Sequence, residues 1–266
     1  MEEVPSQFSS VIGMGTVQAI YQARKVNKWI GLVIGLLSLA GFGLMLLITA
    51  YSTYEQVAKY GAAVLVKTAT PLMVISCILF IIAVVALWSA FINWNKALVF
   101  YQHGFAYNDR KGVQTWRWED VLNFKAAVTR HYTNGIYTGT THVYSIEGRD
   151  GQKFVMGDVI NKIEEAADRI RSGIFPGLYS RYAQVYNSGQ LLHFGPVTLS
   201  KVNGIQIGKK VYPWDQVAQV SIRQGYVQVG KQGGGWFSGA SAAAATIPNL
   251  EVFLSIINQV VGVKAS

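Results

Sequence analysis

The chain has 266 residues, a formal net charge of +9, and 51% hydrophobic but only 14% charged residues. An average globular domain carries about 25% charged residues, so part of this chain is expected to lie in a membrane. The single cysteine, Cys77, excludes a disulfide framework within one chain and any cysteine-based metal site.

Two apolar runs predict a transmembrane hairpin. Residues 29–54 and 68–95 contain no charged side chain, and each exceeds the roughly 20 residues that a helix needs to cross a hydrocarbon core of about 30 Å. We expect helices at about 29–51 and 71–93, with Pro71 at the first position of the second helix and a turn between them. The first run is too long for a signal peptide, so we interpret it as a retained anchor.

Basic residues at the ends of the runs favour both termini in the cytoplasm. Arg24, Lys25 and Lys28 precede the first run and Lys96 follows the second, and basic segments resist translocation. The absence of charged residues within the runs argues against a pump or transporter.

Small residues in both runs are candidates for helix packing. Gly31 and Gly35 form a Gly-xxx-Gly pattern, and Ala86 and Ala90 form a weaker small-xxx-small pair. Such spacing permits close contact between helices. We favour packing of the hairpin against itself over an oligomer face, because the pattern is common in glycine-rich membrane helices.

After residue 96, short alternating runs separated by Gly, Asn and Asp predict antiparallel strands, among them strands at 122–128 and 142–147. An amphipathic helix is expected at 158–171, with Asp158 as its N-cap and Gly173 as its stop. A linking helix is expected at 176–187, more strands follow, and a last helix begins at Pro248. The predicted parts are an N-terminal segment at 1–28, the hairpin at 29–95, a lobe at 96–174, the linking helix at 175–189, and a lobe at 190–266.

The two lobes share a residue pattern as well as an order of elements. Gly104-Phe-Ala-Tyr precedes Trp118-Glu-Asp-Val, and Gly204-Ile-Gln-Ile precedes Trp214-Asp-Gln-Val. In each case Gly allows a tight turn, an apolar pair points inward, and Trp begins a strand whose Val returns to the core. The pattern predicts a structural repeat and is silent about binding.

These features resemble bacterial pleckstrin-homology-like domains. The whole order, with two apolar helices, one lobe, a linking helix, a second lobe containing His193-Phe-Gly-Pro, and a terminal helix beginning Ile247-Pro-Asn-Leu, resembles a bacterial membrane family of uncharacterised function. The resemblance implies an α+β fold: a transmembrane hairpin in the bacterial plasma (inner) membrane and two pleckstrin-homology-like β-barrel or sandwich lobes, each closed by a C-terminal helix. Such folds bind proteins or lipids more often than they catalyse reactions.

We find no pattern for catalysis, a cofactor, a metal or nucleic acid. The histidines are His103, His131, His142 and His193, and none has the helical spacing of a zinc site. Glu119 and Asp120 are adjacent on a strand, so they point to opposite faces and do not form an acid–base pair. We therefore expect a protein that is not an enzyme.

Two groups of residues are candidates for interaction. The first consists of basic pairs in equivalent hairpin turns, Arg110-Lys111 and Lys209-Lys210, which suit an anionic lipid surface as well as plain solvent. The second is Trp236-Phe237 within the Gly- and Ala-rich segment 230–246. These aromatics either reach a membrane or partner groove, or fold back onto the second lobe.

The function expected from the sequence is a membrane-anchored scaffold. Its tandem module binds a protein partner or a second copy of the chain at the cytoplasmic face. An accessory subunit of a membrane transport or enzyme complex is the alternative.

Overall fold

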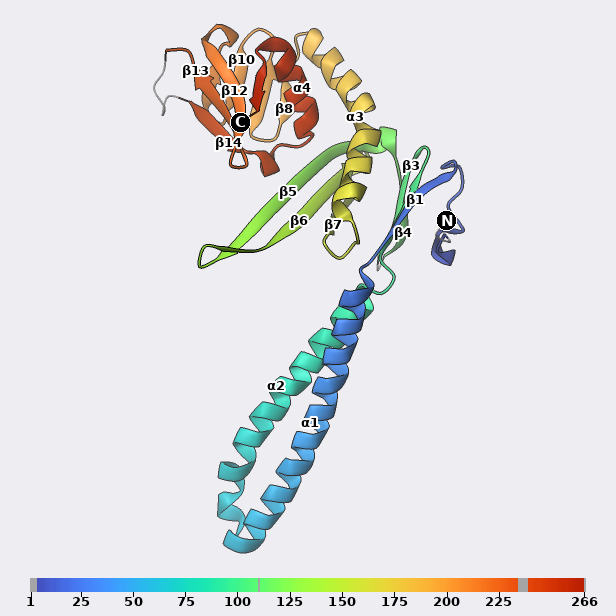
Figure 1. The fold of residues 1–266 in the computed structure, drawn as a ribbon, viewed down its shortest axis with the longest axis vertical. Helices are drawn as coiled ribbons and strands as arrows, with labels where there is room; N and C mark the ends of the chain where they lie inside the picture. Colours follow the sequence, from blue (N-terminus) through green and yellow to red (C-terminus); the bar gives the residue numbers. More distant parts are fainter. Residues whose placement is uncertain (1–3, 110, 234–238, 266) are drawn as a thin grey trace. The chain divides into compact units, whose positions relative to one another are not determined.

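The computed structural model describes residues 4–109, 111–233 and 239–265. The protein has an α+β fold, as expected: two long apolar N-terminal helices are followed by several antiparallel sheets (Figure 1). The chain divides into two compact units. One holds Gln22–Ala97 and Asn108–Val113, and the other holds Met1–Tyr21, Leu98–Tyr107 and Gln114–Ser266.

The first unit contains an antiparallel pair of helices, α1 at Lys25–Tyr60 and α2 at Leu65–Ile92. At 1.5 Å per residue they are about 54 and 42 Å long. Both are long and apolar enough to cross a membrane by length and composition, and their apolar side chains are largely exposed. Along their contact, a Cβ at Gly31 would lie 3.1 Å from Ala90 Cβ and 3.2 Å from the Ala86 carbonyl oxygen.

The connection between the helices is shorter than the sequence indicated. The helices were expected at about 29–51 and 71–93 with a turn between them, but α1 continues to Tyr60 and only residues 61–64 separate it from α2. Glu55, Ala58 and Lys59 are good helix formers, so the helix extends past the apolar run. Pro71 lies inside α2 and not at its first position.

The first lobe comprises strands β1 to β7. A four-stranded sheet has the order β1-β2-β3-β4, and a three-stranded sheet has the order β5-β6-β7. The strands are β1 (Val17–Gln22), β2 (Ala97–Tyr101), β3 (Gly104–Asp109), β4 (Gly112–Arg117), β5 (Val121–Thr133), β6 (Ile136–Gly148) and β7 (Lys153–Gly157). Strand β1 precedes α1, so the expectation that this lobe begins at residue 96 is wrong: α1 and α2 are inserted between its first two strands.

A polar cluster joins β1 to the helix that follows β7. The Tyr21 hydroxyl donates to Glu165 Oε1 at 2.7 Å and accepts a hydrogen bond from Arg169 Nε at 2.7 Å. Burial, followed by the hydrogen bond to Glu165, raises the pKa of Tyr21 above its usual value. The hydrogen bond from Tyr21 is in turn the main cause that lowers the pKa of Glu165. The segment before the helices is therefore an integral part of the first lobe.

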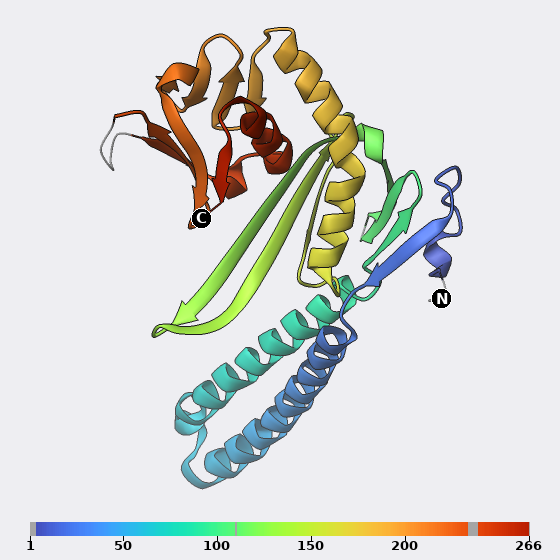
Figure 2. The ribbon, with the colours of Figure 1, turned by 45° about the horizontal axis from the view of Figure 1, so that its top comes forward.

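The helix after β7 is one element where two were expected. Helix α3 runs over Ile163–Asn187 with Pro176 inside it, and it lies along the β5-β6-β7 sheet (Figures 1 and 2). Gly173 was expected to end a helix. Instead, a Cβ there would lie 2.8 Å from the Trp118 ring, so glycine makes room for that side chain. A stripe of buried side chains continues past Gly173 and Pro176 and favours an unbroken helix. Its members are Ile163, Ala166, Ala167, Ile170, Ile174 and Leu178.

The second lobe comprises β8 to β15. One sheet has the order β11-β10-β9-β8 and the other β14-β13-β12-β15, in which β15 is parallel to β12. The elements are β8 (Leu192–Phe194), β9 (Val197–Ser200), β10 (Gly204–Ile207), β11 (Lys210–Tyr212), β12 (Val217–Arg223), β13 (Tyr226–Lys231), β14 (Ala240–Ala243), α4 (Leu250–Val260) and β15 (Val263–Ala265). Strand β14 lies within the Gly- and Ala-rich segment 230–246 and pairs with β13.

The repeat seen in the sequence is present in the structure. Each lobe has a sheet of four strands, a 3-10 turn that begins at Trp118 or Trp214, and then strands of a second sheet. Trp118 Nε1 donates to the Gln102 carbonyl at 3.1 Å, and Trp214 Nε1 donates to the Ser200 carbonyl at 2.9 Å. A Cβ at Gly104 would collide with the Trp116 carbonyl, and one at Gly204 with the Tyr212 carbonyl. These glycines thus permit close approach of the facing strand.

A buried asparagine fastens the two lobes together. Asn249 Oδ1 accepts a hydrogen bond from the Phe124 backbone N–H at 2.9 Å, and Asn249 Nδ2 donates to the Leu122 carbonyl at 2.8 Å. The Asn249 backbone N–H also donates to the Phe124 carbonyl at 2.8 Å. Nearby, Arg171 of α3 bonds Glu251 of α4 at 2.8 Å. One hydrophobic core extends through both lobes.

Candidate functional site

The feature that distinguishes the first lobe from the second is a long two-stranded β-ribbon. Strand β7 pairs with β6 only between Val143 and Glu147, so residues 128–142 form a ribbon of two strands beyond the three-stranded sheet (Figures 1 and 2). At about 3.4 Å per residue it extends roughly 20 Å. We call residues 128–142 the ribbon.

The turn at the end of the ribbon has the geometry of a tight hairpin. Asn134 and Gly135 have φ values of 50° and 79°, as required at the two central positions of a type I′ turn. The matching hairpin of the second lobe, β12–β13, turns at Gln224 and Gly225 with φ values of 50° and 78°. Its strands have seven and six residues, against thirteen in each of β5 and β6. The ribbon is therefore an extension of a hairpin common to both lobes.

Large side chains are exposed at the end of the ribbon. Ile136 is 71% exposed, Tyr132 61% and Tyr137 55%. The two tyrosine rings pair with centroids 5.9 Å apart in a T-shaped arrangement. Between Val121 and Ile146 the sequence holds no acidic residue, whereas it holds Lys125 and Arg130. The ribbon thus combines aromatic and aliphatic side chains with positive charge.

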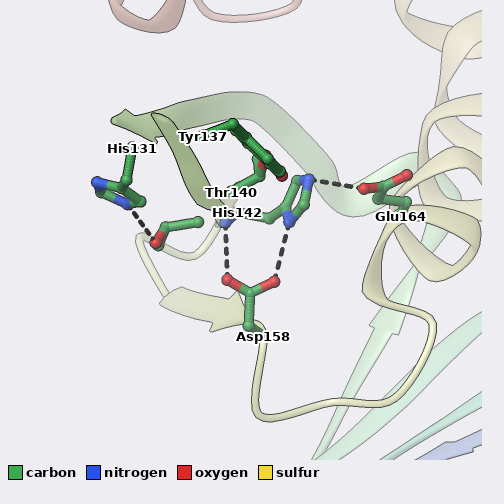
Figure 3. A network of polar contacts seen from close by, with 7 residues as sticks. His131, Tyr137, Thr140, His142, Asp158 and Glu164 are labelled. Carbon is green, nitrogen blue, oxygen red and sulfur yellow. Dashed lines mark hydrogen bonds and ion pairs between the residues drawn. The ribbon is translucent and has the colours of Figure 1, made fainter. Parts of the chain in front are cut away.

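The base of the ribbon is held by His142, which lies between two carboxylates (Figure 3). Its backbone N–H donates to Asp158 Oδ2 at 2.9 Å, its Nδ1 lies 2.9 Å from Asp158 Oδ1, and its Nε2 lies 2.7 Å from Glu164 Oε1. The His142 side chain is 12% exposed and that of Glu164 68%. A doubly protonated ring donates to both carboxylates, whereas a neutral ring donates to one only. Asp158, expected as a helix N-cap, thus anchors the ribbon instead.

Two further contacts stiffen the ribbon above this base. Tyr137 Oη lies 2.7 Å from Thr140 Oγ1, and His131 Nε2 lies 2.8 Å from Thr141 Oγ1. Among the residues that the structure describes, no group of three His, Cys, Asp or Glu side chains is placed to hold a metal ion.

A small apolar cavity lies at the junction of the two lobes. It has a volume of about 120 Å³ and is lined by β5, α3 and the start of α4. Arg171 and Glu251, the ion pair between the lobes, are among its lining residues, and the Arg171 guanidinium lies 5.8 Å from the Phe124 ring centroid. The cavity is large enough for a few methyl-sized groups and too small for a cofactor.

The basic residues selected from the sequence occupy equivalent turns. Lys111 lies in the β3–β4 turn, Lys209 lies in the β10–β11 turn, and Lys210 begins β11; all three are exposed. The Lys111 backbone N–H donates to Asp109 Oδ1 at 2.8 Å. Arg110, Trp236 and Phe237 lie outside the described residues. Among the described residues, no recorded contact joins Lys111, Lys209 or Lys210 to the ribbon.

The small residues selected in the helices face each other across the hairpin. Gly31 lies against Ala86 and Ala90, and Gly35 lies against the Leu87 side chain. At the same end of the helices, Trp29 and Trp94 form a T-shaped pair at 6.5 Å, and Lys28 Nζ bonds the Trp94 carbonyl. These contacts lie within one hairpin.

The ribbon was missed in the sequence, although a signal for it exists. Strands were expected at 122–128 and 142–147, which left residues 129–141 unassigned. That segment is rich in Thr and Tyr on both sides of Asn134-Gly135, and Asn-Gly between such runs is a strong indicator of a two-residue hairpin.

Comparison with known proteins places the chain in a family but gives no activity. No curated protein matches it at a significant level. A family model matches residues 1–265, which is nearly the full length. The chain therefore belongs to DUF6585, a family of unknown function.

Proposed function

We propose that the protein is a non-enzymatic scaffold anchored in the bacterial plasma membrane. Its two lobes form a tandem pleckstrin-homology-like module, each closed by the helix that follows it, and the module binds a protein partner or a second copy of the chain in the cytoplasm. Along the chain, each lobe has four strands, then three strands and a helix, with β15 following α4 in the second lobe; this repeat supports the interpretation of the lobes.

The observation that carries the proposal is the insertion of α1 and α2 between two paired strands. Strand β1 ends at Gln22 and α1 begins at Lys25; α2 ends at Ile92 and β2 begins at Ala97. Because β1 and β2 belong to one sheet, a hairpin that crosses the bilayer has both of its ends on the same side. An even number of membrane crossings and short connections hold the module next to the membrane.

The charge at these connections supports a cytoplasmic module. Arg24, Lys25 and Lys28 stand at the start of α1, and Lys96 follows α2. Basic residues beside membrane spans remain on the cytoplasmic side. The lobes and both termini are then cytoplasmic, and the α1–α2 connection lies outside.

One observation favours the alternative of an accessory subunit in a membrane complex. A groove of about 640 Å³ between α1 and α2, near their connected ends, is lined mainly by small and apolar side chains, among them Ala50, Ala58 and Ala69. Thr53 lines it too, and its Oγ1 is buried without a hydrogen-bond partner. Another transmembrane helix could fill such a groove through close packing and a hydrogen bond.

Purification in mild detergent tests the function. The scaffold proposal predicts that the chain elutes as a homo-oligomer or with a stoichiometric protein partner, as measured by mass after subtraction of detergent. A monomer with no co-purifying protein contradicts it. The alternative predicts that a transporter or enzyme co-purifies with the chain. The Ala58→Leu variant should lose this protein, because the substitution fills the groove. Gly43→Leu is the matched control, because a Cβ at Gly43 meets nothing within 4 Å.

A further inference from the structure

The ribbon lacks the support that an isolated pair of strands normally needs. Two-stranded hairpins are marginally stable in water unless a third strand or a packed helix covers them. The three-stranded sheet ends at Val143, yet the hairpin continues with its large side chains exposed at the tip. The same hairpin in the second lobe stops at Arg223 and Tyr226. The extra length is therefore not required by the lobe fold, and it is suited to contact with something outside it.

One face of the ribbon carries most of its interacting groups. Cross-strand partners share a face, and successive residues alternate between faces. The register pairs Val128 with His142, Arg130 with Thr140, and Tyr132 with Tyr137, so these six side chains follow one another along a single face. His142 meets Glu164 of α3 at the base. Toward the tip, Val128, Arg130 and the two tyrosines are exposed.

The composition of this face matches a membrane interface. Tyrosine places a ring at the boundary of the apolar region with its hydroxyl in water. At the tip, Ile136 pairs with Thr133 on the opposite face and is 71% exposed, and an exposed aliphatic side chain can enter the apolar region. Arg130 on this face attracts anionic headgroups, and residues 121–146 contain no carboxylate. The carboxylates of Asp158 and Glu164 lie at the base, beside His142. We propose that the tip of the ribbon lies against the anionic phospholipid surface of the membrane that anchors the chain. This inference rests on the proposed membrane anchoring.

Charge argues for lipid over a second copy of the chain. Two identical ribbons paired edge to edge bring the cationic side chains of one, Arg130 foremost, close to those of the other, and like charges on paired strands are destabilising. An anionic bilayer instead lowers the free energy of each cation. Membrane contact would give the module a second attachment besides the helices and so limit its rotation about them.

A fluorescent probe at the tip tests the proposal in the full chain. The chain with Cys77→Ser and Ile136→Cys is labelled with an environment-sensitive dye and placed in nanodiscs of phosphatidylcholine, with or without phosphatidylglycerol. We expect a blue shift and quenching by nitroxide-bearing lipids in the anionic discs. The matched control is Gln224→Cys, in the equivalent exposed turn of the second lobe, where we expect neither change.

Variants of the same face make the test specific. Arg130→Gln should reduce the equilibrium constant for contact by about fivefold, since one cation near an anionic surface contributes ~1 kcal/mol. Tyr132→Ser with Tyr137→Ser should reduce the quenching seen in the anionic discs. Circular dichroism of each variant shows that the lobes remain folded.

Three outcomes would overturn the proposal. A label at residue 136 that behaves like the label at 224 shows that the tip stays in water. A blue shift of the dye at residue 136 that appears only with two chains per disc shows that the tip contacts a second copy. If the chain does not enter nanodiscs at all, the membrane anchoring fails as well, whereas successful insertion with an unquenched tip refutes only the inference about the ribbon.

Discussion

Replacement of Asn249 by alanine should destabilise the junction of the two lobes strongly. The change removes both side-chain hydrogen bonds to β5 and leaves the Phe124 N–H and Leu122 carbonyl without these partners. Each buried polar group left unpaired costs about 1–3 kcal/mol. Asn249 also has φ of 52°, where an alanine costs about 1 kcal/mol more. The expected loss of unfolding free energy is therefore about 3–7 kcal/mol.

The matched control is Asn134→Ala. Asn134 has nearly the same φ, 50°, but it lies in the exposed turn of the ribbon. Its replacement should lower the unfolding free energy by about 1 kcal/mol, which is the cost of placing alanine at a positive φ. Both variants are compared with the parent by urea unfolding of the detergent-solubilised chain, and tryptophan fluorescence monitors the unfolding. If Asn249→Ala unfolds at the same urea concentration as Asn134→Ala, the junction described above does not hold the lobes together.

Three further predictions concern the hairpin and the first and second lobes. Gly31→Leu should lower the melting temperature in detergent because its side chain would displace Ala90, and Gly43→Leu should leave it unchanged; equal effects would refute the helix contact. Burial raises the pKa of Tyr21 and keeps its hydroxyl protonated in the folded chain, while in the unfolded chain the hydroxyl ionises with the ordinary tyrosine pKa of about 10. Its contribution is thus lost as pH rises through the folded-state pKa, and Tyr21→Phe should make stability less sensitive to pH above about 10; an unchanged alkaline limb in a pH titration of unfolding contradicts this. Trp214→Ala should lower the unfolding free energy by about 3 kcal/mol, the lower end for truncation of Trp, because this ring is only half-buried. A variant that melts like the parent would show that Trp214 does not pack as the repeat predicts.

The elements predicted well are those whose pattern is local. The uncharged runs mark α1 and α2, and alternation marks most strands after residue 96. The two Gly-to-Trp patterns mark equivalent segments of the lobes, although each Trp begins a 3-10 turn and not the strand that was expected. Such patterns need only the immediate sequence, since an apolar face or an uncharged run determines where the segment lies.

The elements that were missed depend on distant partners. Strand β1 has a weak pattern of its own, and its place comes from β2, which lies beyond both long helices in the sequence. Helix α3 passes Gly173 and Pro176 because buried residues on both sides stabilise it, and tertiary packing outweighs the local propensity. Strand β14 is made of Ala and Ser, poor strand formers that pair because β13 offers its edge.

The candidate site was predicted only in part for the same reason. Lys111 and Lys209 could be placed in equivalent turns from the repeat alone. The contacts of His142 with Asp158 and Glu164 join β6 to the segment after β7. Nothing in the spacing of these residues along the sequence indicates that they meet. Asp158 before a helical pattern instead suggested a cap.

The topology of the hairpin is the most direct test of a membrane-anchored module. Single cysteines replace Lys59 near the α1–α2 connection and Lys209 in the second lobe, both in a Cys77→Ser background, and intact cells that express the chain are treated with a membrane-impermeant thiol reagent. We predict labelling at position 59 in intact cells and at position 209 only after the membrane is opened. Labelling at 209 but not at 59 in intact cells would contradict the orientation, and labelling of neither until lysis, with the chain recovered in the soluble fraction, would contradict the anchor itself.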